Sequence, residues 1–271
     1  MGGREDLAAL ARGILAAAIT AADPAAFTTA ALEHAIGRAA GLEKTPQNRP
    51  HWIIAVGKAA ESMSRAALTF CSSRSITVGG GLVVSTSNAG AGDDALLHIA
   101  GDHPVPGERS LRAADRLGEL CEDVTADGVA LVLVSGGASS LLGAPVAGVS
   151  LADLAALHTI LLGSGLDIAR MNAVRKRFSR WGAGRLAAAL APAVVQPVLL
   201  SDVPGDDEAA IGSGPCAPDP TTAEQLEAIL RGARVARRVP LSIASHLGAV
   251  RAGSLPETPK PGSPVFHHVR A

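Results

Sequence analysis

Three short apolar runs in this chain each lead directly into a cluster of small and polar residues. The runs cover residues 52–56, 130–134 and 197–200. Each has the length and the β-branched content of a strand that is buried on both faces. Predicted helices separate the runs along the chain. Because strands that alternate with helices form βαβ units, we expect an α/β domain built on a mostly parallel sheet.

The remaining elements follow from apolar spacing, capping residues and breaks at glycine or proline. Two N-terminal helices should divide at Asp23-Pro24, where Asp23 can cap and Pro24 can occupy the first helical position. Ser150 is expected to cap a later helix. The expected helices cover residues 4–22, 24–40, 58–70, 108–122, 151–162, 169–190 and 222–234. The expected strands cover residues 52–56, 82–85, 96–99, 129–134 and 197–200.

The composition predicts an aliphatic core and disfavours several kinds of partner. Hydrophobic residues make up 48% of the 271 residues, whereas aromatic residues make up 2% and tyrosine is absent. The formal net charge is −1, so no broad basic field exists to attract nucleic acid or an anionic membrane. Three widely spaced cysteines without a CxxC pair argue against a disulfide framework or a zinc site. They suit a reducing, cytoplasmic compartment.

The N-terminal segment is apolar enough at residues 7–20 to resemble the core of a signal peptide. Arg12 interrupts this stretch, Glu5 and Asp6 stand where positive charge is typical, and the leucines fall at helical spacing. We therefore expect an amphipathic helix. In the sequence, no stretch reaches the ~20 uncharged apolar residues that a membrane span needs.

The polar clusters after the strands should meet at one edge of the sheet, where open α/β sheets bind their ligands. Lys58 follows the first strand at the start of a helix, where a cation is favourable only if an anion binds beside it. The alternative is a solvated surface lysine. The surrounding sequence is not a Walker A motif, because the spaced glycines and the following Ser or Thr are absent.

A glycine-rich turn follows the second strand. Gly136 and Gly137 would allow backbone N–H groups to face an anion closely, and the hydroxyls of Ser135, Ser139 and Ser140 would add hydrogen-bond donors. The alternative is a plain strand-to-helix turn, which favours the same residue types.

Asp202 and Asp206 follow the third strand and are separated by a Val-Pro-Gly turn that can direct both carboxylates into one pocket. Mg²⁺ usually takes one or two carboxylates together with substrate phosphates. One of the aspartates could instead accept the proton of an attacking hydroxyl. The alternative is a turn in which they accept local backbone hydrogen bonds. A lysine, a glycine-rich turn and two aspartates at neighbouring strand ends together predict a phosphoryl-transfer site.

Two further groups could contact a substrate. Asn172, Arg175 and Lys176 stand at i, i+3 and i+4 of an expected helix, so they can share one face. Arginine binds a small carboxylate through two hydrogen bonds, although a solvated basic face is the more common outcome of such a run. His103, in a proline-rich loop at residues 101–107 that should be rigid, could orient a substrate.

The end of the chain indicates a domain boundary. Residues 255–262 form a proline-rich connector, and residues 265–269 look like the start of another strand. A connector of this kind normally leads to a further unit. We therefore expect one domain over residues 1–254, followed by a linker and the start of a truncated second domain over residues 255–271.

Taken in order, these segments resemble the type II glycerate kinases, whose C-terminal half is called the MOFRL domain. The matching pieces are residues 55–60, 101–106, 133–142, 161–165, 171–176, 200–207, 211–215, 218–219 and 257–260. The resemblance implies a Rossmann-like three-layer α/β/α domain, a smaller C-terminal domain and an active site in the cleft between them. It also implies ATP-dependent phosphorylation of D-glycerate to 2-phosphoglycerate with Mg²⁺.

The resemblance also implies roles for individual residues. Lys58 would be the catalytic lysine and Asp202 the catalytic aspartate. Asp206 is the candidate metal ligand from the analysis of the strand ends, and the resemblance assigns it no role. The loop that begins at Ser135 would bind phosphate. Asn172 and Arg175 would bind the substrate.

The chain departs from the family pattern in several places. Ala138 replaces a third glycine of the loop, Arg177 stands where histidine is frequent, and residues 182–185 carry one lysine fewer. The largest departure is the C-terminal domain, into which family members continue beyond the linker. A cleft with one wall should exclude water poorly. We therefore expect this chain alone to be weakly active or inactive.

Two other functions remain as alternatives. A hydroxypyruvate reductase is disfavoured, because no GxGxxG motif is followed at the right distance by an acidic residue, and Gly79-Gly80-Gly81 precedes its strand. A non-catalytic domain that binds a sugar acid or a nucleotide is the second alternative. The face that would meet a second domain could be solvated, filled by a separate chain or covered by a homodimer.

Overall fold

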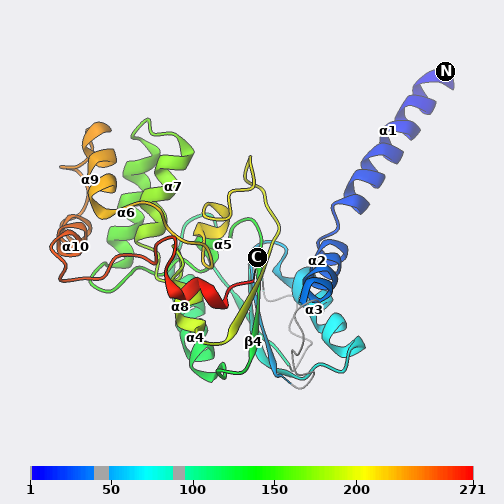
Figure 1. The fold of residues 1–271 in the computed structure, drawn as a ribbon. Coiled ribbons are helices and arrows are strands. Elements are labelled where there is room, and N and C mark those ends of the chain that lie inside the picture. The colour runs from blue at the N-terminus through cyan, green and yellow to red at the C-terminus, as the bar shows by residue number, and fades with distance from the viewer. Residues whose placement is uncertain (1, 40–48, 88–94, 271) are drawn as a thin grey trace.

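The computed structural model describes residues 2–39, 49–87 and 95–270, which contain a five-stranded parallel sheet (Figure 1). The strands are β1 (His51–Val56), β2 (Val78–Ser85), β3 (Leu97–Ala100), β4 (Val129–Val134) and β5 (Val194–Leu199). Their order is β3-β2-β1-β4-β5, and every neighbouring pair is parallel. The order reverses between β1 and β4, as in a doubly wound Rossmann-type sheet. The predicted mostly parallel sheet is therefore confirmed.

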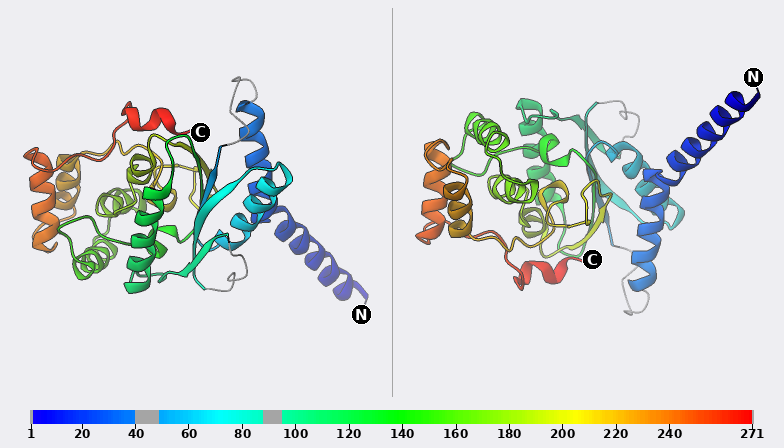
Figure 2. Two further views of the ribbon diagram at one scale, coloured as in Figure 1. Left: turned by 90° about the horizontal axis from the view of Figure 1, so that it is seen from below. Right: turned by 90° about the horizontal axis from the view of Figure 1, so that it is seen from above.

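Helices cover both faces of the sheet, which confirms the three-layer prediction. The N-terminal helices lie on one side of the sheet and the later helices on the other (Figure 2). The first four helices are α1 (Gly2–Ala21), α2 (Pro24–Ala39), α3 (Ala60–Ser73) and α4 (Glu108–Asp123). The next four are α5 (Ala138–Leu141), α6 (Leu151–Leu162), α7 (Ile168–Arg177) and α8 (Arg185–Leu190). The last two are α9 (Ala223–Gly232) and α10 (Leu241–Arg251).

The central strand β1 contributes side chains to the hydrophobic core on each face of the sheet. Successive side chains of a strand point to opposite faces of its sheet. Ile53 and Ala55 of β1 therefore pack with α2 and α3, whereas Ile54 and Val56 pack with α4 and α8. All four residues are buried. Both cores are aliphatic for the most part, as the composition predicts.

Four helices form a third apolar cluster that is separate from the two cores of the sheet. Helices α6, α7, α9 and α10 gather at one end of the molecule (Figure 1) and bury Leu157, Phe178, Leu226 and Leu247 among themselves. We call these four helices the helical lobe. Ser150 caps α6 by accepting a hydrogen bond from the N–H of Asp153, as predicted. Helix α10 was not among the helices expected from the sequence pattern.

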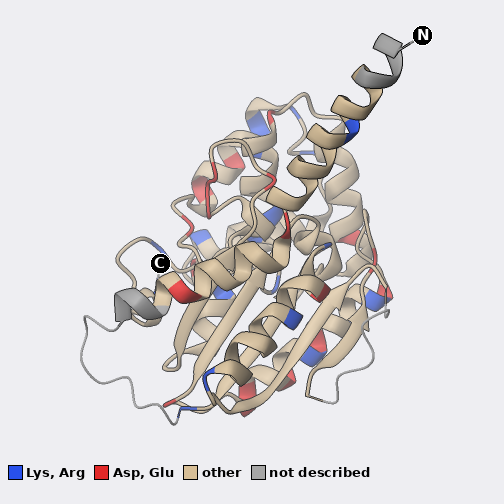
Figure 3. Ribbon diagram, turned by 90° about the vertical axis from the view of Figure 1, so that its right-hand side faces the viewer, with Lys and Arg blue, Asp and Glu red and all other residues tan. Residues whose placement is uncertain are grey.

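Helix α1 extends away from the rest of the described chain (Figures 1 and 2). Its large apolar side chains are exposed, with Leu7 at 67% and Ile14 at 64%. Residues 7–35 are long and apolar enough to cross a membrane by length and composition, a property shared by core helices and signal sequences. Arg12 and Asp23 both lie within this stretch, which carries few other charges (Figure 3).

Two predicted elements are wrong. The single helix expected over residues 169–190 is two helices, because the chain turns between α7 and α8 at Ala183 (φ +55°) and Gly184 (φ +79°). A Cβ at Gly184 would lie 2.8 Å from a ring carbon of Phe266, so this turn depends on glycine. The strand expected over residues 265–269 is a 3₁₀ turn that ends in one parallel bridge between Val269 and β5.

Candidate active site

The carboxyl ends of β1, β4 and β5 meet at one edge of the sheet, because these three strands are neighbours. The turns after β1 and β4 bind each other directly. The N–H of Lys58 donates to the carbonyl of Gly136 at 2.9 Å, and the N–H of Ala59 donates to Oγ of Ser135 at 3.1 Å. The hydroxyl of Ser135 is therefore a structural acceptor that joins the two turns.

Three polar side chains lie close to the glycine turn. A Cβ on Gly136 would lie 2.2 Å from Oδ2 of Asp202. A Cβ on Gly137, whose φ is +88°, would lie 3.1 Å from Cδ2 of His103 and 3.4 Å from Cγ of Lys58. Lys58, His103 and Asp202 thus surround one turn, although they are far apart in the sequence. All three residues are exposed.

The two remaining serines of the turn connect it to other loops. Oγ of Ser139 lies 2.7 Å from Oγ of Ser213, which belongs to the Gly-Ser-Gly segment after β5. The hydroxyl of Ser140 donates to the carbonyl of Pro104 at 2.9 Å and so holds the loop that carries His103. Ser139 is exposed and Ser140 is half-buried, and both hydroxyls already have a hydrogen-bond partner within the domain.

Asp102 explains why the proline-rich loop keeps a defined shape. Its carboxylate accepts hydrogen bonds from the N–H groups of Arg109 and Ser110 at the start of α4, and it pairs with Nε of Arg109 at 2.7 Å. The hydrogen bond from the Arg109 side chain is the main cause that lowers the pKa of Asp102. The loop beyond it presents His103 to an open pocket of about 440 Å³, which Arg112 also lines.

The two candidate metal ligands lie in an exposed turn. Asp202 and Asp206 both face solvent, and Asp206 has a φ of +51°. Within the described ranges, no group of three or more His, Cys, Asp or Glu side chains could hold a metal ion by itself. One or two carboxylates with substrate phosphates are the usual protein share of an Mg²⁺ site, and this turn supplies that number.

Helix α7 divides its basic residues between two environments. The guanidinium of Arg175 forms no ion pair among the described residues, its Nε is buried without a hydrogen-bond partner, and burial lowers its pKa. Lys176 and Arg177 are instead buried, at 6% and 0% exposure. Lys176 is therefore buried and paired with Asp219, and the alternative of a solvated basic face does not hold for it.

Lys176 and Arg177 belong to a buried ionic cluster that the sequence analysis missed. Nζ of Lys176 lies 3.1 Å from Oδ1 of Asp219, and Nη1 of Arg177 lies 2.6 Å from Oε2 of Glu257. Side chains of Thr258 and Lys260 complete the set. We call Lys176, Arg177, Asp219, Glu257, Thr258 and Lys260 the ionic cluster. The cluster fixes the connector beyond α10 to the end of α7.

Comparison with known proteins assigns the chain to a protein family. Residues 10–248 match the family described as a domain of unknown function, DUF4147. The chain belongs to this family.

Relatives of this DUF4147 chain carry two kinds of name. A D-glycerate 2-kinase of Thermotoga maritima is 39% identical over 180 residues, 66% of this chain and 42% of the relative. A glycerate 2-kinase of Pyrococcus horikoshii is 33% identical over 217 residues, 80% of this chain and 48% of the relative. An Agrobacterium vitis protein with the provisional name hydroxypyruvate reductase is 39% identical over 178 residues, 66% of this chain and 46% of the relative.

The fold agrees with a solved structure of a named kinase. A crystal structure of glycerate kinase from Thermotoga maritima superimposes with a TM-score of 0.72 and 31% identity, and the match covers 92% of this chain and 56% of that one. The DUF4147 chain spans about half the length of the curated relatives it matches.

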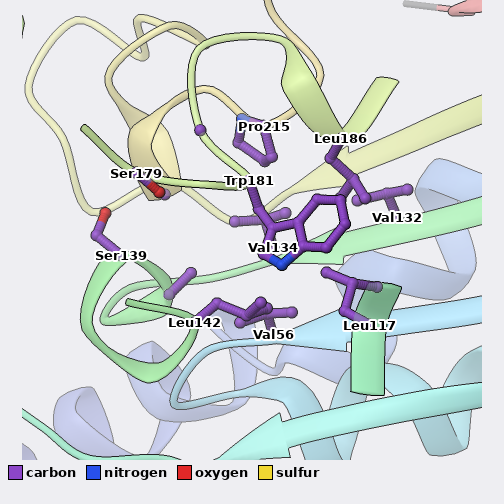
Figure 4. A pocket seen from close by; sticks show the side chains of 13 residues that line it. Val56, Leu117, Val132, Val134, Ser139, Leu142, Ser179, Trp181, Leu186 and Pro215 are labelled. Carbon is purple, nitrogen blue, oxygen red and sulfur yellow. The ribbon is translucent and has the colours of Figure 1, made fainter. Parts of the chain in front are cut away.

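The apolar cavity behind the glycine turn is too small for a substrate. It encloses about 20 Å³ between Val134, Trp181, Leu186 and Pro215, with Ser139 at its rim (Figure 4). A volume of this size holds about one water molecule.

Ser213 and Asp102 are the site residues that sequence reasoning missed. Ser213 lies in a Gly-Ser-Gly segment in which both glycines have positive φ, and that segment was a visible signal of a tight turn. Gly107, at the start of α4, has no side chain that could cap the helix, and Asp102 accepts hydrogen bonds from the first turn in its place. This role depends on the folded loop, so the local sequence did not reveal it.

Proposed function

We propose that this chain is the N-terminal part of a glycerate kinase that transfers a phosphoryl group from ATP to the 2-hydroxyl of D-glycerate. The observation that carries the proposal is the meeting of Lys58, the Gly136–Gly137 turn and Asp202 at the reversal point of the sheet. The names of the Thermotoga and Pyrococcus relatives supply the substrate.

Each residue has a separate task in the proposed reaction. The ammonium group of Lys58 and the N–H groups of the glycine turn stabilise negative charge on the transferred phosphoryl group. Asp202 accepts the proton of the substrate hydroxyl, whose oxygen forms the new bond to phosphorus while the bond to the leaving ADP breaks. Asp206 is the proposed ligand of Mg²⁺, which would neutralise charge on the phosphates. Asn172 and Arg175 bind the carboxylate of D-glycerate.

The wider organisation of the enzyme is part of the same proposal. Residues 1–254 form the Rossmann-like domain, and residues 255–271 form a linker to a second wall of the cleft. We propose a cytoplasmic enzyme, consistent with three cysteines that are free in the structure. We further propose that turnover by this chain alone is weak, because one wall excludes little water.

The competing proposal is a hydroxypyruvate reductase, the provisional name of the Agrobacterium relatives. The turn after β1 contains one glycine and a lysine, not the three glycines that cradle a dinucleotide. Gly81 lies inside β2, where a Cβ would lie 2.3 Å from the carbonyl oxygen of Ile53. Gly81 therefore allows β1 and β2 to pack closely, and it does not indicate a nicotinamide site.

A coupled ADP-release assay with D-glycerate, ATP and Mg²⁺ tests the proposal. We would measure the chain as given, and a version extended by the C-terminal half of the Thermotoga relative. We expect turnover in the extended form, at least a hundredfold loss in Lys58→Ala, and little change in Arg65→Ala, which removes an exposed charge from α3. No turnover by the folded extended form, or oxidation of NADH with hydroxypyruvate, would contradict the proposal.

A further inference from the structure

Within the connector at residues 255–262, each of residues 257–260 binds a residue outside the connector. The carboxylate of Glu257 pairs with Arg177 and accepts the N–H of Ala223 at the start of α9. Pro259 accepts the N–H of Asp219 through its carbonyl oxygen at 2.9 Å. A segment that served only as a flexible tether would not need four consecutive anchoring residues.

The partners of the connector are buried and have few alternatives. The Asp219 side chain is fully buried and accepts from Thr221 at 2.5 Å, from Thr258 at 2.9 Å and from Lys176 at 3.1 Å. The Arg177 side chain is 1% exposed. A buried charge that loses its partner is strongly unfavourable, so these groups hold one arrangement.

The same cluster fixes the rotation of α7. Lys176 and Arg177 are the last two residues of that helix, and their side chains are held from the Asp219 loop and the connector. Successive residues of a helix are about 100° apart around its axis. Anchoring these two positions therefore determines where Arg175 points.

The cluster also adjoins the glycine turn through one segment. Asp219 ends a stretch that begins near Ser213, whose hydroxyl contacts Ser139. A Cβ at Gly182 would lie 3.1 Å from the carbonyl oxygen of Ser213 and 3.2 Å from that of Lys176. Gly182 therefore packs closely against both the end of α7 and the segment that carries Ser213.

We infer that the ionic cluster is a positioning device through which the connector sets the orientation of Arg175 toward the acid substrate. The inference rests on the proposed function for the identity of that substrate. Glu257 and Asp219 are positioning residues, since they act through α7. Because the cluster holds α7 directly, the position of whatever follows the connector is coupled more strongly to the binding of the acid than to the binding of the nucleotide.

The test uses the 271-residue chain and two readouts. Calorimetric titration would give the dissociation constants of D-glycerate and ATP for the wild type, Glu257→Gln and Glu227→Gln. Glu227 is the matched control, because its carboxylate pairs with Arg231 and Arg251 between α9 and α10 and does not touch α7. We expect Glu257→Gln to weaken D-glycerate binding at least tenfold and ATP binding less than twofold, with no change for the control.

Hydrogen exchange supplies a readout that needs no ligand. Amides of α7 and of residues 219–223 should exchange at least tenfold faster in Glu257→Gln than in the wild type, while those of β1 and β4 stay unchanged. Equal effects of Glu257→Gln and Glu227→Gln, or equal losses of D-glycerate and ATP affinity, would overturn the inference. If the wild type binds no D-glycerate, the proposed function fails for this chain, and the exchange of α7 alone decides whether the coupling exists.

Discussion

The glycine turn and the ionic cluster use the same kinds of charged side chain in opposite ways. At the glycine turn, Lys58 and Asp202 are exposed, and no ion pair joins them to another described residue. In the cluster, Lys176 and Asp219 are buried and paired at 3.1 Å. A charged side chain that binds a ligand has to remain exposed and unpaired. A charged side chain that stabilises the fold is buried and paired with an opposite charge. Four predictions test this contrast, from the largest expected effect to the smallest.

Asp202→Asn should abolish most activity without affecting stability. Loss of the proton acceptor should lower kcat about 10³-fold, ~4 kcal/mol of transition-state stabilisation, because general bases contribute on this scale. The free energy of unfolding should change by less than ~0.5 kcal/mol, since the side chain is exposed. The measurement is steady-state kinetics on the extended form together with urea denaturation. Asp207→Asn is the control in the same turn, and equal losses in both variants would show that Asp202 has no special role.

Asp219→Ala should mainly lower the stability of the fold, in contrast to Asp202→Asn. It leaves the ammonium of Lys176 and the guanidinium of Arg177 buried without their carboxylate. We expect a loss of about 3 kcal/mol in the free energy of unfolding, the scale for a broken buried pair. Urea denaturation of the variant beside Glu227→Gln, which breaks a more exposed ion pair worth ~0–1 kcal/mol, checks the difference. A loss below 1 kcal/mol would mean that the cluster does not hold the connector.

Gly137→Ala and Gly148→Ala separate backbone strain from crowding. Both glycines have φ between +80° and +90°, but only at Gly137 would a Cβ meet His103 and Lys58. Each variant should lose ~1–2 kcal/mol of stability from the left-handed backbone. Only Gly137→Ala should also lower turnover by more than tenfold. Equal turnover in the two variants would contradict the close approach of those side chains.

Acid should weaken the ionic cluster through protonation of Glu257. Burial raises the pKa of Glu257, but hydrogen bonds from Arg177, Ala223 and Lys260 outweigh burial and lower it to about 2, from an ordinary value of 4.5. Its stabilisation is therefore present above pH 4.5 and is lost as the pH falls towards 2. Because a third of the side chain is exposed, we expect ~1 kcal/mol. The stability difference between the wild type and Glu257→Gln should narrow in urea titrations from pH 6 to pH 3.

Much of the sheet could be predicted from local patterns. The runs at residues 52–56, 130–134 and 197–200 lie within or overlap β1, β4 and β5, because continuous apolar sequence is typical of strands buried on both faces. Caps were also predictable, since Ser150 accepts a hydrogen bond within its own first turn. The single helix over residues 169–190 failed because Ala183 and Gly184 adopt positive φ and end the helical path there, although the helical spacing continues through them.

The basic run on α7 shows the limit of spacing arguments most directly. Helical periodicity places Asn172, Arg175 and Lys176 on one face. It contains no information on the carboxylate of Asp219, which pairs with Lys176 from a loop more than forty residues away. Asp219 and Glu257 decide that Lys176 and Arg177 are buried while Arg175 keeps an unpaired guanidinium.

The sequence by itself determined the alternation of strands and helices and the polar residues that follow each strand, because both depend on neighbours along the chain. It also predicted that these residues share an edge, since parallel strands place their carboxyl ends together. Only the tertiary structure decided which charges remain free. Pairing depends on burial and on partners brought together by folding, and Lys58 and Lys176 differ in nothing but their surroundings.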